Sequence, residues 1–487
     1  MEWIIANMAP LMFGALVLFL LFGYPVAFAL AANGIVFGLL GMELGLLQPA
    51  IFQALPERIF GIMANDTLLA IPFFTFMGLI LERSGMAEDL LDTIGQLFGP
   101  MRGGLAYAVI FVGALLAATT GVVAASVISM GLISLPIMLR YGYDKRLASG
   151  VIAASGTLAQ IIPPSLVLII MADQLGRSVG DMYEGAMVPG LVLTGLYVGY
   201  VALLTIFKPA AAPALPPEAR SLRGFQLFLR VITTMVPPLL LIFLVLGTIF
   251  LGIATPTEGG AMGAAGALIM ALMRKRLDWK LLKQAMATTG KLSSFVVFIL
   301  VGSTVFGLVF RAVNGDLWVE HLLLSLPGGE LGFLIVVNIL VFVLAFFLDF
   351  FELSFIVVPL LGPVAEKLGI DLVWFGVLLA VNMQTSFMHP PFGFALFYLR
   401  SVAPPSVKTT DIYWGAIPFV CIQIIMVAII ITFPNIVSYG DPEAKARMEQ
   451  QGDVDLNTLM HNDEGRSDAP SEESASELLK NLQSNNK

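Results

Sequence analysis

Two clusters of small polar residues each precede a pair of adjacent prolines. The first cluster comprises Ser155, Gly156 and Thr157, ahead of Pro163 and Pro164. The second comprises Asn382, Gln384, Thr385 and Ser386, ahead of Pro390 and Pro391. Proline removes a backbone N–H and leaves carbonyl groups of the preceding turn without a partner. Such carbonyls, with hydroxyl and amide oxygens beside them, are suited to hold a hard cation such as sodium.

Two other segments are expected to face these clusters, with the substrate between the two halves. Those facing the first cluster are Thr119, Thr120, Gly121 and Ser126, and those facing the second are residues 349–354, with Asp349 and Glu352. Two alternatives stay open. Small and hydroxyl residues in membrane helices also serve close packing, and the two acidic residues are either functional groups or the mark of a loop at the membrane interface.

The composition indicates that these clusters lie inside a membrane. The 487 residues are 58% hydrophobic and 12% charged, with a mean hydropathy of +0.89, whereas soluble chains carry about 25% charged residues. The uncharged stretch 103–139 is too long for one span of about 20 residues, and charged residues separate 331–348 from 353–365. We therefore predict an all-α polytopic membrane protein in which re-entrant hairpins accompany true spans.

An internal repeat explains why the two clusters look alike. Residues 136–164 align with residues 363–391 at a constant offset of 227 and without gaps. The identities are Pro136/Pro363, Gly142/Gly369, Asp144/Asp371, Ala153/Ala380, Pro163/Pro390 and Pro164/Pro391. Chance matches between apolar helices involve Leu, Val and Ile, whereas Pro and Gly have specific backbone roles. We predict two inverted repeats with discontinuous helices at equivalent positions, an arrangement typical of a transporter's midplane site.

The chain divides into four predicted segments. Residues 1–207 and 231–440 are the two halves, and residues 208–230, which are basic and rich in Pro and Ala, are expected to form a cytoplasmic linker. Residues 441–487 contain 11 acidic and 5 basic residues and are expected to form a disordered tail. No basic residue follows Met1 directly, so we expect an uncleaved N-terminus.

Several classes of protein are excluded by motifs that the sequence lacks. It has no GxxxxGKS or GxxxxGKT motif for nucleotide phosphates and no basic patch interleaved with aromatics for nucleic acid. Its apolar runs contain no Ser/His/Asp or paired-Asp constellation, and Cys421 stands alone. We therefore expect no enzymatic activity and no cofactor, with sodium ions at the polar clusters as the coupling ions.

Several short motifs resemble those of the large membrane subunit of the tripartite ATP-independent periplasmic (TRAP) transporters. They are Ile71-Pro72-Phe73-Phe74, Met101-Arg102-Gly103-Gly104-Leu105, Gly142-Tyr143-Asp144, Ile162-Pro163-Pro164-Ser165 and Thr255-Pro256-Thr257-Glu258. The resemblance runs from about residue 10 to residue 435. One motif departs from the pattern, because Thr119-Thr120-Gly121-Val122 stands where many relatives have a Ser-Gly-Ser type turn.

The resemblance implies more than the residues themselves indicate. It implies a multi-pass protein of the bacterial inner membrane that acts as a sodium-driven secondary transporter with an elevator mechanism and with hairpins at the substrate site. It also implies a small four-helix membrane subunit and a periplasmic solute-binding protein as partners. The predicted function is sodium-coupled uptake of a small organic acid. The alternatives are a self-sufficient sodium/carboxylate symporter and a membrane subunit of an ion-translocating enzyme complex.

Overall fold

The computed structural model describes residues 2–120, 123–220 and 222–437. All regular secondary structure in these ranges is helical, and the ranges belong to one compact unit. The all-α prediction is confirmed. The predicted tail, residues 441–487, lies outside the described residues.

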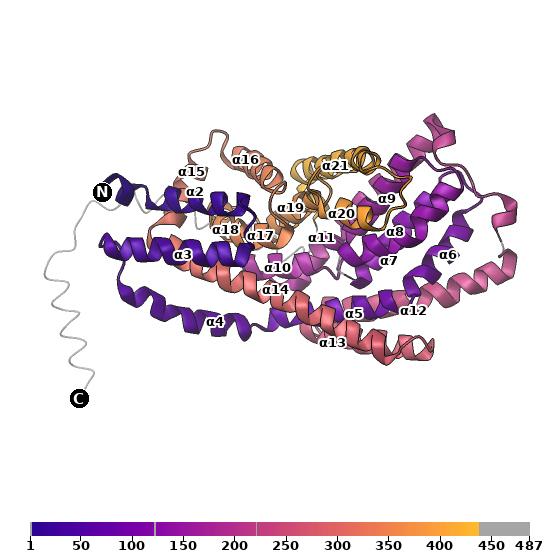
Figure 1. The fold of residues 1–487 in the computed structure, drawn as a ribbon, viewed down its shortest axis with the longest axis horizontal. Helices are drawn as coiled ribbons and strands as arrows, with labels where there is room; N and C mark the ends of the chain where they lie inside the picture. The colour runs from indigo at the N-terminus through magenta and orange to yellow at the C-terminus, as the bar shows by residue number, and fades with distance from the viewer. Residues whose placement is uncertain (1, 121–122, 221, 438–487) are drawn as a thin grey trace, which may run out of the picture. The chain divides into compact units, whose positions relative to one another are not determined.

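The helices fall into two consecutive sets along the chain (Figure 1). After α1 (Glu2–Ala6), the first set comprises α2 (Met8–Leu21), α3 (Val26–Glu43), α4 (Leu55–Met63), α5 (Asp66–Arg83), α6 (Met86–Phe98), α7 (Gly104–Thr120), α8 (Val123–Arg140), α9 (Lys145–Thr157), α10 (Leu166–Leu175) and α11 (Val179–Phe207). The second comprises α12 (Gly224–Phe250), α13 (Pro256–Met273), α14 (Trp279–Ala312), α15 (Gly315–Leu324), α16 (Gly329–Leu344), α17 (Phe350–Ile356), α18 (Val358–Lys367), α19 (Leu372–Met383), α20 (Phe394–Val402) and α21 (Thr409–Thr432). Short 3₁₀ turns are η1 (Pro49–Ala54), η2 (Leu158–Gln160), η3 (Pro209–Ala211), η4 (Pro217–Ala219), η5 (Gln384–Phe387) and η6 (Pro434–Ile436).

The residues that carry the sequence repeat perform the same local task in both sets. Gly142 and Gly369 adopt the left-handed backbone conformation, with φ of +82° and +76°, which glycine reaches without steric cost. Two residues later, Asp144 and Asp371 are the N-caps of α9 and α19, and their carboxylates accept backbone N–H bonds of the first helical turn. The repeat therefore reflects equivalent turns into two equivalent helices.

Those two helices both end before the paired prolines. α9 ends at Thr157, passes through η2 and resumes as α10 only at Leu166. α19 ends at Met383, passes through η5 and resumes as α20 at Phe394. Both Pro-Pro peptide bonds, Pro163–Pro164 and Pro390–Pro391, are cis. The predicted discontinuous helices are confirmed.

A helical hairpin precedes each broken helix. In the first set, α7 and α8 pack against each other and against α9, which accounts for the long uncharged stretch 103–139. In the second set, α16 is followed by the short helix α17 and by α18, and α16 and α18 both pack on α19. The predicted hairpins are confirmed, and in the first set both arms, α7 and α8, also contact η2 at the break.

Away from the hairpins and the broken helices, long helices of one set pack against long helices of the other. α3 packs along α14, and α13 packs along α5 (Figure 1). The first pair makes backbone contact, because a Cβ atom at Gly302 would collide with the carbonyl oxygen of Ala27, and small residues are the usual means of such close approach in membranes. α4 and α5 bend by 46° at residues 64–65, whereas α14 is continuous over 34 residues.

The segment between the two sets, whose described part begins with residues 208–220, is held to the first set by backbone hydrogen bonds. The N–H groups of Gly103 and Asp144 donate to the carbonyls of Ala212 and Ala211, and Leu215 N–H donates to Gly99, all at 2.9 Å. These bonds tie the segment to the ends of α6, α7 and α9. α12 already begins at Gly224, so the helix takes in the last residues of the predicted 208–230 linker.

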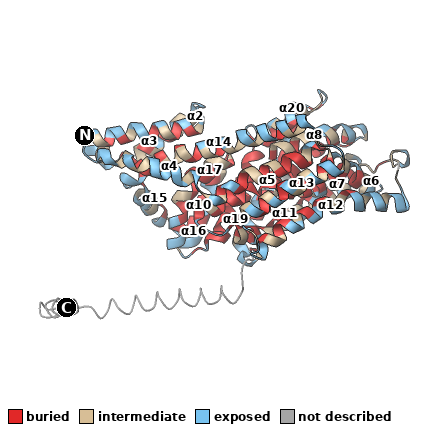
Figure 2. Cartoon of the chain, turned by 90° about the horizontal axis from the view of Figure 1, so that it is seen from below, coloured by how far each residue is buried: buried red, intermediate tan, exposed pale blue. Residues whose placement is uncertain are grey.

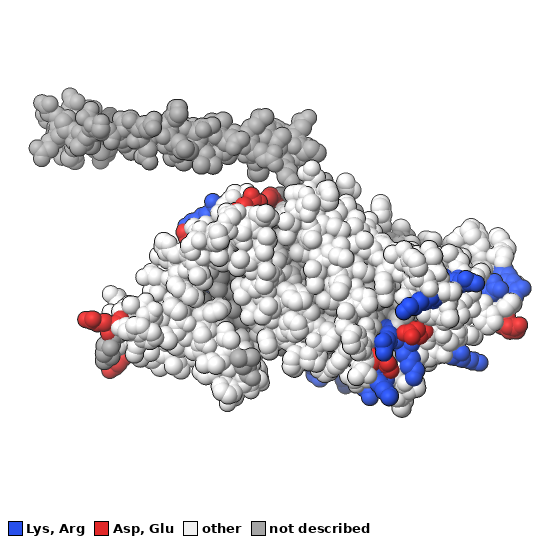
Figure 3. Space-filling view, turned by 90° about the horizontal axis from the view of Figure 1, so that it is seen from above, with Lys and Arg blue, Asp and Glu red and all other residues white. Residues whose placement is uncertain are grey.

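Six of the described helices are long and apolar enough to cross a membrane, or eight if each bent pair counts as one span. The core lies around the breaks, since every residue of α19 is buried (Figure 2). In the view of Figure 3, charged side chains gather at the margins of the described part, most of all at its right end, and leave a broad uncharged surface between them. At one basic cluster, Arg230, Arg274 and Arg276 surround Asp89 at 3.2–3.4 Å.

Candidate functional site

The two helix breaks meet inside the protein. The side-chain amide of Gln384 donates a 3.1 Å hydrogen bond to the hydroxyl of Thr157, and that hydroxyl donates to the carbonyl of Ala154 at 2.8 Å. Thr157 and Gln384 are 227 positions apart, which is the offset of the sequence repeat. Equivalent positions of the two sets are therefore in direct contact, and the polar clusters ahead of the prolines form one continuous region.

The first cluster is buried and closely packed. The hydroxyl of Ser155 donates to the carbonyl of Val151 in its own helix at 2.6 Å, and its Cβ leaves no room for a side chain at Gly113 of α7. A Cβ at Gly156 would collide with Val127 of α8. Ser126, in the first turn of α8, is also buried. The first hairpin therefore packs against the helix that leads into the first break.

The remaining predicted residues of the first hairpin are less fully described. Thr119 and Thr120 form the last turn of α7, and their side chains lie outside the described residues, as does Gly121 entirely. Their assignment to a sodium site stays a prediction.

The second cluster is tied to the second hairpin. The amide of Asn382 donates to the backbone carbonyl and to the side-chain carbonyl of Asn338 on α16, at 2.9 and 2.8 Å. The hydroxyl of Thr385 donates to the carbonyl of Asn382 at 2.7 Å. Asn338 was not predicted, although an amide in the apolar run 331–348 is the kind of signal that marks a buried polar contact.

Two oxygen atoms in this second break are buried without a hydrogen-bond partner among the described residues. They are Oε1 of Gln384 and Oγ of Ser386, in side chains that are 0% and 2% exposed. Buried polar atoms are rarely left without a partner in proteins, because the loss of hydration is costly. Oxygen donors of this kind fit a hard cation such as sodium.

Asp349 and Glu352 form the bend of the second hairpin. Each carboxylate accepts the backbone N–H of the other residue at 2.9 Å, which is a reciprocal capping box at the start of α17. The structure thus gives the pair a local structural role. The same two residues also line a cavity. The two alternatives, a functional group and a loop residue, therefore both stay open for Asp349 and Glu352.

That cavity, of about 350 Å³, lies where both hairpins, both broken helices and two long helices come together. Its walls come from α5, α8, η2, α10, α14, α17, η5 and α20. The polar residues that line it are Thr75, Gln160, Asp349, Glu352 and Tyr398. Thr75, Gln160 and Tyr398 were not predicted. Gln160 lies just upstream of Pro163 in an apolar run, a signal that could have identified it.

The paired prolines lie in the breaks between the helices and have no backbone N–H group to donate. Pro163 and Pro164 are buried, Pro390 is half-buried and Pro391 is exposed. The neighbouring His389 packs between the rings of Phe342 and Phe346, with ring centroids 4.3 and 4.2 Å away. Aromatic packing thus holds the imidazole of His389 at the second break.

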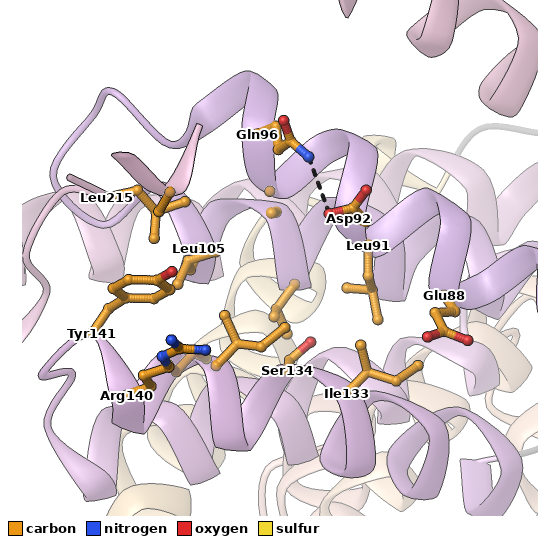
Figure 4. A pocket seen from close by; sticks show the side chains of 16 residues that line it. Glu88, Leu91, Asp92, Gln96, Leu105, Ile133, Ser134, Arg140, Tyr141 and Leu215 are labelled. Atoms are coloured by element: carbon orange, nitrogen blue, oxygen red, sulfur yellow. Dashed lines mark hydrogen bonds between the residues drawn. The ribbon is translucent and has the colours of Figure 1, made fainter. Parts of the chain in front are cut away.

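A second cavity of about 350 Å³ lies away from the breaks, among α6, α7, α8 and the segment between the two sets (Figure 4). Leu91, Ile133 and Leu105 project into it, and Asp92 accepts a hydrogen bond from Gln96 at 3.2 Å on its rim (Figure 4). None of its lining residues belongs to either break. The cavity at the two breaks is the candidate substrate site because residues of both breaks, Gln160 and Phe387, line it.

The fold is found in a known transporter. The crystal structure of the Alcanivorax borkumensis YdaH transporter superposes with a TM-score of 0.56 and 15% sequence identity, covering 81% of this chain and 91% of that chain. At that identity the likeness concerns the fold alone.

Sequence comparisons identify the family. The large permease protein DctM of a C4-dicarboxylate TRAP transporter from Pseudomonas aeruginosa is 31% identical over 80% of this chain and 90% of its own length. The protein of the same name from Vibrio cholerae is 30% identical over 85% and 92%. The sialic acid TRAP transporter permease SiaT of Haemophilus influenzae is 27% identical over 80% and 62%. Residues 13–436 match the family model described as "Tripartite ATP-independent periplasmic transporter, DctM component", and the chain belongs to this family.

Proposed function

We propose that this large permease carries out sodium-coupled uptake of a small organic acid, together with a small four-helix membrane subunit and a periplasmic solute-binding protein. The chain is a multi-pass protein of the bacterial inner membrane, and its relatives are named as transporter permeases. Coupling ion, substrate class and partners are the proposed parts.

The observation that carries sodium coupling is the pair of partnerless oxygens in the second break. Oε1 belongs to the Gln384 side chain that contacts Thr157, and Ser386 follows two residues later in the same break. A sodium ion held there would bridge the two broken helices, and its charge would help to hold an acidic substrate nearby. The ion and the acid would thus favour each other's binding, as coupling requires.

The cavity also offers a place for a carboxylate. Leu166 and Val167, the first two residues of the ten-residue helix α10, line it. The N-terminus of a helix carries a partial positive charge and N–H donors that favour an anion. Ser165 already caps the N–H groups of Val167 and Leu168, so it is the partial positive charge of the helix end that would favour a carboxylate in this cavity.

The arrangement of helices suits an elevator mechanism. The crossed pairs α3–α14 and α5–α13 form a frame, and the hairpins with the broken helices form a body within it. The cavity has walls from both, because α5 and α14 belong to the frame and α8, α10, α17 and α20 belong to the body. Movement of the body along the frame would carry the substrate across the membrane.

Reconstitution tests the proposal. Proteoliposomes that contain this chain and its small subunit should take up the substrate when the binding protein is outside and a sodium gradient points inward. Replacing that gradient with a potassium gradient, or omitting any component, should abolish uptake. Full-rate uptake by this chain alone would favour a self-sufficient symporter, and sodium-independent uptake would contradict the proposal.

A further inference from the structure

Another cavity of about 350 Å³ has walls from α4, α5 and α14 on one side and from α10, α17 and α18 on the other, and two arginines line it. Arg58 belongs to α4, and Arg311 belongs to the last turn of α14. Both residues are exposed, and neither forms a hydrogen bond or an ion pair with another described residue. The lining therefore contains two guanidinium groups for which the described chain supplies no carboxylate.

The acidic residue in the same lining is already engaged. Among the described residues that line the cavity, Asp173 is the one acidic residue. Its Oδ1 accepts a hydrogen bond from the amide of Asn65 at 2.6 Å, and its Oδ2 accepts one from the amide of Gln174 at 2.8 Å. The lining thus carries two positive charges and one negative charge. A concave lining with net positive charge attracts small anions and raises their local concentration.

This cavity and the cavity at the breaks follow one another along shared helices. On α14, residues within 292–296 line the cavity at the breaks, and residues within 300–311 line this one. On α10, residues 166–167 line the former and residues 173–174 line the latter. Because a helix rises 1.5 Å per residue, positions 296 and 300 are about 6 Å apart along α14. The two cavities are therefore neighbours between the frame and the body.

The basic residues of the chain indicate on which side of the membrane this cavity lies. α14 begins at Trp279, shortly after the run Arg274-Lys275-Arg276, and basic loops mark the cytoplasmic side. The 34 residues of α14 extend about 51 Å, which exceeds the hydrocarbon thickness of about 30 Å. Arg311, at the other end of α14, therefore lies toward the periplasm.

We propose that this cavity is an entry site for the acid, in which Arg58 and Arg311 bind a carboxylate on its way from the periplasm to the cavity at the breaks. Guanidinium groups pair with carboxylates through two parallel N–H···O bonds, and the volume is in the range of small-molecule sites. The proposal rests on the proposed uptake of an organic acid and adds a second binding site to it.

Thiol reagents of different charge measure the electrostatic potential in this cavity. Gly307 lines it one turn before Arg311, and a Cβ atom at Gly307 meets nothing within 4 Å, so Gly307→Cys places a thiol in the cavity. In a Cys421→Ser background, the full chain in detergent would react with a sulfonate-bearing and with a trimethylammonium-bearing methanethiosulfonate. Each rate would be divided by the rate of the same reagent with a small free thiol.

The anionic reagent should be favoured over the cationic one. Arg58→Gln and Arg311→Gln should each lower the ratio of the two rates about fivefold, because each removes one positive charge from the lining. Thr304→Cys, which also lines the cavity, provides a second thiol position if Gly307→Cys folds poorly.

Occupation by a carboxylate is tested with a neutral reagent, whose rate does not depend on the potential. Potassium acetate and potassium succinate should slow the reaction of methyl methanethiosulfonate at Gly307→Cys more than potassium chloride does at equal ionic strength, because a bound acid covers the thiol. This protection should be lost in Arg58→Gln and kept at least in part in Arg58→Lys, which retains the charge. A ratio that neither arginine affects, or the absence of protection by both acids, would overturn the proposal and leave the arginines to a protein partner.

Arg83→Gln is the matched control. It also removes one positive charge, but Arg83 does not line the cavity and donates instead to Gln284 and Thr288 at 3.4 and 3.1 Å. Arg83 lies at the far end of α5, about 25 Å along the helix from Asp66, which is well beyond the screening length of about 10 Å. Its replacement should leave both the rate ratio and the protection unchanged.

Uptake by the reconstituted transporter connects the site to transport. The double variant Arg58→Gln with Arg311→Gln should raise KM about tenfold, since a charged cleft speeds the arrival of its ligand by that order, and it should leave kcat unchanged. A lower kcat at an unchanged KM would contradict an entry site. The reagent experiments need neither sodium nor uptake. Their failure would overturn this proposal and leave sodium coupling standing, whereas sodium-independent uptake would count against the proposed function and leave the arginine site in place.

Discussion

The side-chain amide of Asn65 donates a 2.6 Å hydrogen bond to a carboxylate oxygen of Asp173. Asn65 lies in the bend between α4 and α5, where its own oxygen caps α5, and Asp173 lies in the last turn of α10. This contact joins a helix of the frame to the broken helix of the body. In an elevator mechanism it has to break during each transport cycle.

A cross-link at this contact should stop transport. In a Cys421→Ser background, Asn65→Cys with Asp173→Cys would be joined by a short bifunctional thiol reagent. Uptake by the reconstituted transporter should be lost after cross-linking, because the body can no longer move along the frame. A cross-linked transporter that retains its uptake rate would contradict the elevator mechanism.

A second pair of cysteines provides the control for that experiment. Arg177→Cys with Glu366→Cys replaces an ion pair of 3.1 Å between the loop after α10 and α18, both parts of the body. Cross-linking within the body should leave uptake unchanged, which separates a specific effect from damage by the reagent.

The hydrogen bond between Thr157 and Gln384 should couple the two repeats energetically. Thr157→Val and Gln384→Leu should each lower the unfolding midpoint in detergent, because a buried polar atom loses its partner, at a cost of about 1–3 kcal/mol. The double variant should be more stable than the sum of the single losses predicts. Strict additivity in this double-mutant cycle would show that the contact contributes no coupling.

Backbone contact between α9 and α21 should make Gly150 intolerant of even a methyl group. A Cβ atom there would collide with the carbonyl oxygen of Gly415, so Gly150→Ala should lower the unfolding midpoint, in line with overpacking costs of about 1–3 kcal/mol. Gly195→Ala, on α11 where no atom lies within 4 Å of the added Cβ, should be neutral or stabilising. Similar midpoints for the two variants would contradict the packing described.

The hydroxyl of Thr385 should be needed for the response to sodium. Thr385→Val keeps the shape of the side chain and removes the hydroxyl, so sodium-dependent uptake should be lost while the protein stays folded. Thr205→Val is a matched control, since both hydroxyls donate to the carbonyl three residues earlier at 2.7 Å. Uptake would be measured over a range of sodium concentrations, and an unchanged sodium dependence in Thr385→Val would remove this residue from the site.

Ser155 calls for a different substitution. Since its side chain already abuts Gly113, a bulky replacement would disturb packing as well as any ion. Ser155→Ala removes only the hydroxyl, which the structure shows bonded to Val151. Because the partnerless oxygens of Gln384 and Ser386 lie in the other break, Ser155→Ala should change sodium dependence less than Thr385→Val does, and a larger effect in uptake assays would reverse the ranking of the two breaks.

The sequence sufficed to predict the breaks, because the residues that make them have narrow backbone preferences. Paired prolines cannot continue a helix, and Gly142, Gly369, Asp144 and Asp371 mark the same turn and cap in both halves. The repeat also aligned residues 136–164 with residues 363–391, and the structure brings these two segments into contact at Thr157 and Gln384.

The residues of the cavity were harder to predict. Thr75 belongs to α5, a helix that is not part of the aligned repeat, and it reaches the breaks only through the packing of the frame on the body. Gln160 and Asn338 are single amides in apolar runs, and no spacing within the sequence assigns them a partner. Such positions depend on tertiary contacts rather than on local pattern.

The most direct test of the central claim is the effect of sodium on the purified chain. Its unfolding midpoint would be measured in sodium chloride and in potassium chloride at equal ionic strength, for the unaltered chain and for Ser386→Ala, which removes one of the two partnerless oxygens of the second break. The account predicts a higher midpoint in sodium for the unaltered chain and a smaller increment for the variant. Equal midpoints in the two salts, or a full sodium increment in Ser386→Ala, would contradict it.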